Sequence, residues 1–413
     1  MFAIHSSPLG RLGTRDTGGM SVYIRELAQW LGQWGLRVDI FTCDGSEHTG
    51  IIELRPNVRL IHLLPKGVSE ISKEQLPQQL NAVFDAVQSY CRKHALVYDL
   101  IHSHYWLSGV VGDMARAIWH GPHVTMFHTL GMVKNSTASG ENESDRRIAH
   151  ERWLAKVADM IVVPAARERD HLIHLYNAPP QKIRIVPCGV NLERFKPMDR
   201  ADSRRRLGIP MNAQVALFVG RFAPLKGIDA LLGAMADLKQ SKPDLHLMVV
   251  GGDGPEAPGT QALMQQVDAL GLKGRVLFAG RTGHKKLPAY YCAADLLVVP
   301  SHYESFGLVV LEALACGTPV LATPVGAVET IIQPGVNGII VDRPARDVVA
   351  RGMVQLLEQR LHESKGPENI RATVSHCGWE RIAAQVVQVY ADLVQTHECP
   401  ASHWAAGCSG LTN

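Results

Sequence analysis

Glu304 and Glu312 are the residues of this sequence whose type and spacing suggest chemistry most directly. Seven residues separate them. The apolar run 296–299 predicts a buried parallel strand and 307–315 has helical periodicity, so Glu304 lies at a strand-to-helix turn, where α/β sheets bind ligands. The helix start offers free N–H groups to a phosphate, and Glu312 follows about 12 Å along the axis. The pattern indicates a nucleotide-sugar site, with the sugar at one end and the ribose at the other.

Two other interpretations of this glutamate pair are weaker. A glycosidase needs its two carboxylates about 5 to 9.5 Å apart across one bond, which is shorter than this spacing. A surface helix with two solvated glutamates fits the bare spacing equally well. The surrounding frame, Ser-Phe-Gly-Leu at 305–308 and Ala-Cys-Gly-Thr-Pro at 315–319, favours the ligand site.

Two cations and a glycine pair are placed where they can bind a diphosphate. Arg221 and Lys226 lie on a loop between a predicted strand, 215–219, and the start of a helix. In a dry site, fixed cations stabilise a leaving nucleoside diphosphate more as its charge grows than they stabilise the ground state. Gly18 and Gly19 directly precede another predicted helix, so backbone N–H groups can approach an anion there. An exposed basic loop and a flexible glycine loop are the alternatives.

Histidines accompany two further predicted strands. His102 and His104 lie at the end of one apolar run, and His128 follows another. The first pair could suggest a metal site, but no third ligand has suitable spacing, so a structural role is favoured. For His128 the residues alone leave a core role and a site role equally open. No carboxylate in these motifs is placed as an obvious nucleophile.

Composition excludes several classes of function. The 413 residues suit two domains of about 200 residues each. Charged residues make up 20% and the formal net charge is +3, which does not indicate a protein that binds nucleic acid or a membrane surface. No apolar run reaches about 18 residues and no signal peptide is evident, so we expect a cytoplasmic protein without a membrane-spanning segment. The eight cysteines lack zinc spacing and are expected to be reduced.

Strand and helix signals alternate along the whole chain, which predicts an α/β protein with two doubly wound parallel sheets. A polar, proline-bracketed segment at 187–197 separates the two runs and is expected to be a linker. The predicted organisation is a first domain at 1–193, a second at 194–377, a helix at 378–396 and a loose tail at 397–413.

The strands expected from apolar runs alternate with helices such as 22–34. One further strand is expected at 2–5, ahead of the first glycine-rich loop. The others are 37–42, 58–63, 100–103, 123–127, 160–163 and 183–186 in the first domain, and 215–219, 245–250, 276–279, 296–299, 320–322 and 338–341 in the second.

Together these motifs resemble the family 4 retaining glycosyltransferases, whose GT-B fold has two Rossmann-like domains facing an interdomain cleft. The resemblance implies a UDP-sugar donor and assigns Glu304 to the sugar hydroxyls and Glu312 to the ribose hydroxyls. It places His128 beside the transferred sugar as a hydrogen-bond donor, not as a nucleophile, and it implies that the helix at 378–396 crosses back onto the first domain. The other donor contacts that it implies are Gly18, Gly19, Arg221, Lys226, Arg281, Phe306, Gly307 and Leu308.

We further expect a front-face displacement with retention. It would pass through an oxocarbenium-like transition state, and the leaving phosphate would take the proton of the acceptor. No cofactor or metal is expected, because Arg and Lys stand at the phosphates and the motifs contain no Asp-x-Asp. The residues that would contribute to catalysis are His128, Glu304, Arg221 and Lys226.

The first domain most resembles the mycothiol-pathway members of this family, which join GlcNAc from UDP-GlcNAc to inositol phosphate. Two cations and two hydroxyls make a chemically sensible site for the acceptor phosphate. The segments that carry the similarity are 5–9, 16–20, 73–77, 104–109, 128–130 and 133–135. The residues that it assigns to the acceptor are Lys73, Tyr105, Thr129 and Arg146, with Met20 and Ser21 beside them.

The acceptor loop departs from that pattern. Arg11, Arg15 and Ser21 stand where the relatives have Gln, Gly and Asn, and Ala-Val-Glu-Thr at 327–330 replaces a Gly-Gly-Leu turn. A sucrose-phosphate-synthase-like enzyme, with UDP-glucose and fructose 6-phosphate, keeps the same donor residues, so both donor sugars stay open. A glycan or lipid acceptor and a homodimer stay open too.

Other classes of protein share parts of this architecture. An NAD-dependent oxidoreductase is disfavoured, because no G-x-G-x-x-G opens a helix with an acid about 20 residues on. A sugar-nucleotide epimerase and an inactive sugar-nucleotide sensor would share the donor contacts but would not turn over an acceptor.

Overall fold

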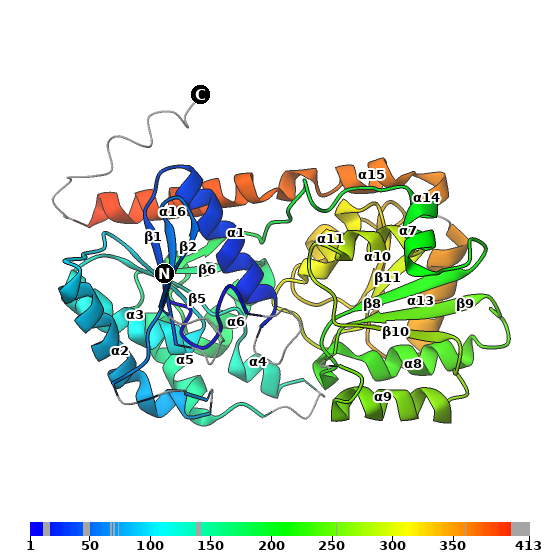
Figure 1. Ribbon diagram of the computed structural model, residues 1–413, viewed down its shortest axis with the longest axis horizontal. Helices are drawn as coiled ribbons and strands as arrows, with labels where there is room; N and C mark the ends of the chain where they lie inside the picture. The colour runs from blue at the N-terminus through cyan, green and yellow to red at the C-terminus, as the bar shows by residue number, and fades with distance from the viewer. Residues whose placement is uncertain are drawn as a thin grey trace.

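The two α/β runs form two lobes that lie side by side in the computed structural model (Figure 1). The structure describes residues 1–10, 17–43, 50–66, 68, 71–72, 74–137, 142–252, 254–359 and 361–397. The predicted tail therefore lies outside the described residues, apart from His397.

The first lobe contains a sheet covered by helices on both sides (Figure 1). Its elements are α1 (Gly19–Gln33), β1 (Val38–Thr42), β2 (Gly50–Arg55), β3 (Val58–His62), α2 (Leu76–Lys93), β4 (Ile101–His104), α3 (Trp106–Trp119), β5 (His123–Met126), α4 (Gly131–Asn135), α5 (Asp145–Val157), β6 (Met160–Val163), α6 (Ala166–Tyr176), the 3₁₀ turn η1 (Pro180–Lys182) and β7 (Ile183–Ile185).

Two ladders, β1-β3-β2 and β4-β5-β6-β7, make up this sheet. Phe2 joins them through parallel bridges to Phe41 of β1 and Ser103 of β4. The prediction of a strand at 2–5 was too long, because the chain already turns where the amide of Ser6 donates to the carbonyl of Ala3. The prediction of parallel sheets missed β2, which pairs antiparallel with β3 at the exposed edge.

The second lobe repeats the plan with one continuous parallel sheet. Its strand order is β10-β9-β8-β11-β12-β13. Its elements are α7 (Arg200–Leu207), β8 (Gln214–Val219), η2 (Pro224–Lys226), α8 (Ile228–Asp237), β9 (Leu245–Val250), α9 (Pro258–Ala269), β10 (Val276–Gly280), α10 (Leu287–Ala293), β11 (Leu296–Val299), α11 (Leu308–Ala315), β12 (Val320–Ala322), α12 (Val328–Ile331), β13 (Gly338–Ile340), α13 (Arg346–Gln359), α14 (Leu361–Ser364), α15 (Pro367–Ala372) and η3 (Ser375–Cys377).

Each sheet reverses its direction of winding at one point. In the second lobe the reversal lies between β8 and β11, and in the first it lies between Phe2 and β4. At such a switch point the loops that follow neighbouring strands diverge and leave room for a ligand at the carboxyl ends of the strands. The loops after β8 and β11 carry Lys226 and Glu304, and the residue directly after β4 is Tyr105. The topology thus gathers the predicted motifs at two sheet edges.

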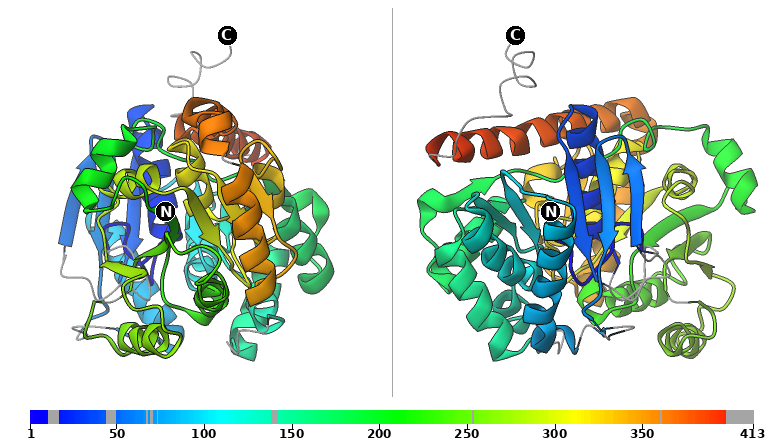
Figure 2. Two further views of the ribbon diagram at one scale, coloured as in Figure 1. Left: turned by 90° about the vertical axis from the view of Figure 1, so that its right-hand side faces the viewer. Right: turned by 60° about the vertical axis from the view of Figure 1, so that its left-hand side comes forward.

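The helix α16 (Trp379–Thr396) returns from the second lobe to the first (Figures 1 and 2). It packs on α1, and its apolar face is buried from Trp379 to Leu393. The ring of Trp379 lies edge-on to Tyr23 at 5.4 Å, and Tyr390 bonds His102 at 2.6 Å. Each such apolar side chain contributes up to about 1.5 to 3 kcal/mol on burial, so α16 is an integral layer of the first lobe.

Two further sequence features have simple structural counterparts. The six described cysteines are all buried free thiols. None of the described helices is both long enough and apolar enough to cross a membrane.

Candidate active site

Lys226 and Glu304 form an ion pair at the switch point of the second sheet. The Nζ atom of Lys226 lies 2.5 Å from Oε1 of Glu304, and Oγ of Ser301 donates to the same oxygen at 3.0 Å. The Lys226 side chain is 21% exposed and that of Glu304 is 12% exposed. A cation and a carboxylate at this spacing can bind a phosphate and sugar hydroxyls side by side.

Gly227 explains why the chain can bring Lys226 to this position. Its φ is +66°, in the left-handed region that favours glycine, and a Cβ atom there would lie 1.8 Å from the carbonyl oxygen of Pro300. The turn after β8 therefore packs directly on the end of β11.

The start of α11 has the features of an anion site. Gly307 is its N-cap, with φ +96°. Within the described part of the chain, the backbone amides of Phe306, Gly307 and Leu308 have no hydrogen-bond acceptor. Free amides and the positive end of the helix dipole both favour a phosphate here. The partly buried Arg221 follows β8 at the same switch point.

The glycine loop of the first lobe meets this helix start. A Cβ atom on Gly19 would lie 3.3 Å from Cδ1 of Leu308, so the exposed Gly19 faces α11 across the domain junction. Gly18 directly precedes α1 as its N-cap. The structure thus brings the two predicted diphosphate segments together.

Glu312 is oriented by two protein donors. Its Oε1 lies 2.7 Å from Nε2 of His284, and its Oε2 accepts from the hydroxyl of Tyr291 at 2.8 Å. Burial, and next the charge of Glu312, raise the pKa of Tyr291 well above its usual range, so the phenol stays a donor. Each carboxylate oxygen retains a lone pair for a further donor. Sequence reasoning missed His284, although it follows the Arg281 motif closely.

Arg281 itself is exposed beyond β10. Its Nε donates to the carbonyl of Gly252 at 3.4 Å. It therefore connects the loop after β10, the edge strand, with the loop after β9.

His128 and Tyr105 follow neighbouring strands in strained backbone conformations. Their φ values are +60° and +76°, which residues other than glycine adopt only when the surroundings impose them. Nε2 of His128 lies 3.0 Å from Nδ1 of His104. Burial lowers the pKa of His128 to about 3, so it is a neutral group that can donate or accept a hydrogen bond but is a weak base.

A buried arginine, Arg147, holds two of the predicted acceptor residues. Its Nη2 donates to the hydroxyl and the carbonyl of Thr129 at 2.9 and 2.8 Å, and its guanidinium carbon lies 4.8 Å from the centre of the Tyr105 ring. Its Nε donates to Glu151 at 2.7 Å. The ring of His5 also packs against Tyr105, with ring centres 4.2 Å apart. Sequence reasoning missed Arg147, which stands in a polar stretch.

The other predicted acceptor residues are spread around this group. Arg146 is exposed, and its Nη2 donates to the carbonyl of Pro77 at 2.6 Å, beside the segment of Lys73. Lys73, Arg11 and Arg15 lie outside the described residues. Ser21 is fully buried, with its hydroxyl 3.0 Å from that of Ser6, whereas Met20 is only partly buried.

Residues 303–305 of the second lobe bind the first lobe directly. The hydroxyl of Tyr303 accepts from the amide of Leu130 at 3.3 Å, and Oγ of Ser305 donates to Glu168 at 3.1 Å. Nearby, Arg167 pairs with Glu329 at 2.6 Å. The segment 327–330, which departs from the resembled pattern, therefore contributes an ion pair between the domains.

The buried carboxyl of Glu168 is expected to make the unfolding free energy of the protein depend on pH. Burial raises the pKa of this carboxyl to about 8. Because the folded-state pKa lies above the unfolded one, Glu168 contributes to the stability of the folded protein below about pH 4.5. This contribution is lost as the pH rises through about 8. In Glu168→Gln, we expect the gain in unfolding free energy over the parent to grow by up to about 1.4 kcal/mol per pH unit between those values. Urea unfolding at pH 5.5, 7 and 8.5 measures this.

The exposed Glu193→Gln is the matched control and should follow the parent at each pH. A constant difference between Glu168→Gln and the parent across this range would contradict the prediction.

Among the described residues, no group of three or more His, Cys, Asp and Glu side chains is arranged to hold a metal ion. His102 and His104 instead serve the packing of the first lobe: His102 bonds Tyr390, and His104 bonds His128.

Comparison with known proteins agrees with this geometry. The family model described as Glycosyltransferase Family 4 matches residues 17–194, and the one described as Glycosyl transferases group 1 matches residues 199–373. A D-inositol 3-phosphate glycosyltransferase of Corynebacterium glutamicum (strain R) is 38% identical over 402 residues, which cover 95% of this chain and 96% of that protein.

Two solved structures are similar along nearly the whole length. Sucrose-phosphate synthase from Thermosynechococcus elongatus has a TM-score of 0.88 and 33% identity and covers 95% of this chain and 98% of its own. Anabaena HepE, in complex with UDP and glucose, has a TM-score of 0.74 and 23% identity over 94% of this chain and 99% of its own, a likeness that shows the fold alone. With relatives above 30% identity over almost the full chain, the protein belongs to the family 4 glycosyltransferases and is a glycosyltransferase of the two-domain GT-B fold.

Proposed function

We propose that this glycosyltransferase transfers GlcNAc or glucose from a UDP-sugar to a small phosphorylated acceptor, with inositol phosphate as the leading candidate and with retention of configuration. The observation that carries the proposal is the pairing of Lys226 with Glu304 beside the free amides that begin α11. That arrangement can bind a diphosphate and the hydroxyls of its sugar at once.

The residues proposed to bind the donor belong to the second lobe. Lys226, Arg221 and the amides of 306–308 would bind the diphosphate, Glu304 the sugar, and Glu312 the ribose. The presence of UDP and glucose in the HepE structure supports a UDP-sugar for a protein of this fold.

The acceptor half rests on the first lobe. Tyr105 and Thr129 share the guanidinium of Arg147, and Arg146, on the same helix, donates to the carbonyl of Pro77. The name of the Corynebacterium relative, a D-inositol 3-phosphate glycosyltransferase, supports an acceptor that carries a phosphate.

Front-face displacement suits the groups at the junction. His128 is neutral and can bond the sugar without acting as a base. Glu168 has a pKa of about 8 and accepts from Ser305, so it is protonated at neutral pH and unsuited to act as a nucleophile. The leaving diphosphate, held by Lys226 and Arg221, would take the proton of the acceptor hydroxyl.

A second candidate is a transferase from UDP-glucose to fructose 6-phosphate. The observation that favours it is the similarity to sucrose-phosphate synthase, with a TM-score of 0.88. Both candidates use a phosphorylated acceptor, so they differ in the ring that carries the phosphate and in the C2 substituent of the donor.

The test is a panel of UDP-GlcNAc and UDP-glucose against inositol phosphate, fructose 6-phosphate and their dephosphorylated forms. We expect transfer to inositol phosphate and little to inositol. Equal kcat/KM with and without the phosphate would contradict the proposal and favour a glycan or lipid acceptor.

Arg146→Ala should raise the acceptor KM about 10-fold or more while the donor KM stays nearly unchanged, because a charge-assisted hydrogen bond contributes about 1.5 to 3 kcal/mol. Initial-rate kinetics with each substrate varied in turn measures this. Arg152→Ala on the same helix is the matched control, since Arg152 is exposed and its guanidinium contacts the sulfur of Met132. A raised donor KM with an unchanged acceptor KM would contradict the assignment of Arg146 to the acceptor. Lys73→Ala is expected to behave as Arg146→Ala does.

Transfer should also persist after treatment with EDTA, because the cations of Arg221 and Lys226 are proposed to take the role of a metal at the phosphates. The measurement is the initial rate before and after chelation. Full inactivation that Mg²⁺ or Mn²⁺ restores would refute this proposal.

A further inference from the structure

A chain of polar contacts joins Glu312 to the first lobe through the linker. Nη1 of Arg194 lies 3.1 Å from Nδ1 of His284 and 3.2 Å from Oε1 of Glu26 on α1. Asn191, also on the linker, donates to the second oxygen of Glu26 at 3.3 Å. The path therefore runs from Glu312 through His284 and Arg194 to Glu26, across both lobes.

The chemistry of Arg194 fixes the protonation of His284. A guanidinium has only donors, so Nδ1 of His284 must accept, and the ring proton must lie on Nε2. Nε2–H then donates to Oε1 of Glu312, at 2.7 Å. A doubly protonated His284 would lose the contact with Arg194, and the opposite tautomer would lose both contacts.

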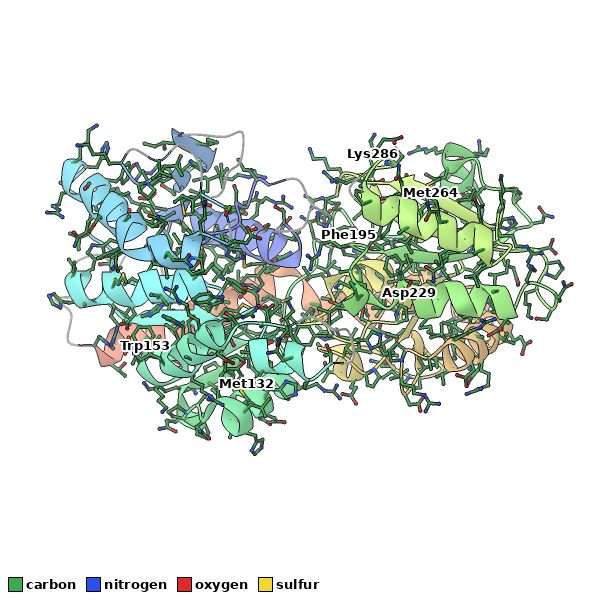
Figure 3. The ribbon with its side chains drawn as sticks, turned by 90° about the horizontal axis from the view of Figure 1, so that it is seen from below. Met132, Trp153, Phe195, Asp229, Met264 and Lys286 are labelled. Atoms are coloured by element: carbon green, nitrogen blue, oxygen red, sulfur yellow. The ribbon has the colours of Figure 1, made fainter. Side chains whose placement is uncertain are left out.

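The surrounding residues hold this series of polar contacts in one arrangement. The side chain of His284 is 10% exposed and that of Glu26 is 3% exposed. The ring of Phe195 packs edge-on to that of His284 at 5.0 Å, and Figure 3 shows Phe195 near the junction of the two lobes. Arg371 binds the linker carbonyls of Leu192 and Phe195 and also the carbonyl of Ala315 at the end of α11. The linker is thus bound to the helix that carries Glu312.

We propose that His284 is a positioning residue for the donor: held by Arg194 as the Nε2–H tautomer, it orients the Glu312 carboxylate for the ribose hydroxyls and couples that contact to Glu26 of the first lobe. The inference rests on the proposed UDP-sugar donor. His284 and Tyr291 each use one lone pair of a different Glu312 oxygen, so each oxygen keeps one lone pair for a ribose hydroxyl. Filling the ribose site and holding the two lobes together then stabilise each other.

The first test is calorimetric binding of UDP and of 2′-deoxy-UDP to the full-length protein. His284→Leu removes both contacts and should weaken UDP binding about 10-fold or more, while its preference for UDP over 2′-deoxy-UDP falls towards one. His284→Gln keeps one donor and one acceptor on a planar group and should recover most of both. In turnover, His284→Leu should raise the donor KM and change kcat and the acceptor KM less than threefold. His246→Leu is the matched control, because the His246 ring forms a local hydrogen bond with the carbonyl of Asp244.

The second test asks whether the contacts act as one chain. Arg194→Met should weaken UDP binding about threefold to 10-fold in the parent and have almost no further effect in His284→Leu, since interacting sites are not additive. Glu26→Gln, on the other lobe, should weaken UDP binding in the parent and likewise lose its effect in His284→Leu.

The outcomes distinguish the proposed role of His284 from the proposed UDP-sugar donor. The parent protein is expected to bind UDP with a clear preference over 2′-deoxy-UDP. If His284→Leu keeps both the affinity for UDP and this preference, the role of His284 is wrong and the donor assignment stands. Full additivity of Arg194→Met with His284→Leu overturns the coupling. If the parent does not bind UDP, the proposed donor is wrong and this inference falls with it.

Discussion

Replacing Lys226 by alanine is expected to lower kcat/KM by about 10²- to 10³-fold, mostly through kcat, which corresponds to about 3 to 4 kcal/mol of lost transition-state stabilisation. Nζ of Lys226 lies 2.5 Å from Glu304, the carboxylate proposed to bind the sugar, and the lysine itself is proposed to bind the diphosphate. The charge on the diphosphate grows as the glycosidic bond breaks, and the lysine responds to that growth.

The measurement is steady-state kinetics with both substrates near saturation. Arg221→Ala should behave similarly, and Lys226→Arg should keep more activity than Lys226→Ala. Lys286→Ala, an exposed lysine of the same lobe labelled in Figure 3, is the matched control. Rates within threefold of the parent for both Arg221→Ala and Lys226→Ala would remove this loop from the site.

Arg147→Met is expected to lower the free energy of unfolding by about 3 to 5 kcal/mol, the usual effect of removing one partner of a buried ion pair. The substitution leaves the fully buried Glu151 facing the hydroxyl of Tyr176 and the amide of Gly131 without a cation. It also removes the donor to Thr129 and the cation over Tyr105. Urea unfolding followed by circular dichroism measures the change.

A double variant separates the buried charge from the lost packing. Arg147→Met with Glu151→Leu should regain most of the stability, because an apolar pair of similar volume avoids the desolvation of both charges. Arg152→Met, on the exposed side of the same helix, should change the stability by less than about 0.5 kcal/mol. A loss of less than about 1 kcal/mol in Arg147→Met would contradict the prediction.

Local patterns predicted the strands because buried parallel strands are short apolar runs between turns. The strands β6, β9, β11 and β12 have the same bounds as the runs predicted at 160–163, 245–250, 296–299 and 320–322. The pattern failed at β2, whose side chains are mostly exposed and so leave no apolar run. It failed again at residues 2–5, where the sheet includes only Phe2.

Candidate donor residues could be found for a related reason. Glu304, Lys226 and the helix start at 307 follow the end of a strand by five, seven and eight residues, and strand ends meet at one edge of a parallel sheet. Arg147 could not be found in this way, because it lies within α5 and does not follow a strand. His284 does follow β10 closely, but its partners Arg194 and Glu312 lie on other elements. In the sequence Arg147 resembles a solvated surface charge, and its contacts with Thr129 and Glu151 become visible only in the folded structure.

The return of α16 to the first lobe has a consequence for synthesis on the ribosome. The last strand of the first sheet ends at Ile185, but the helix that covers Tyr23 and His102 begins only at Trp379. At about 5 to 20 residues per second, that interval is roughly 10 to 40 seconds. During this time the first lobe has emerged with an uncovered apolar face, whereas the second lobe can close its own sheet as soon as it leaves the exit tunnel. The half of the protein that is translated first is therefore the half that is completed last.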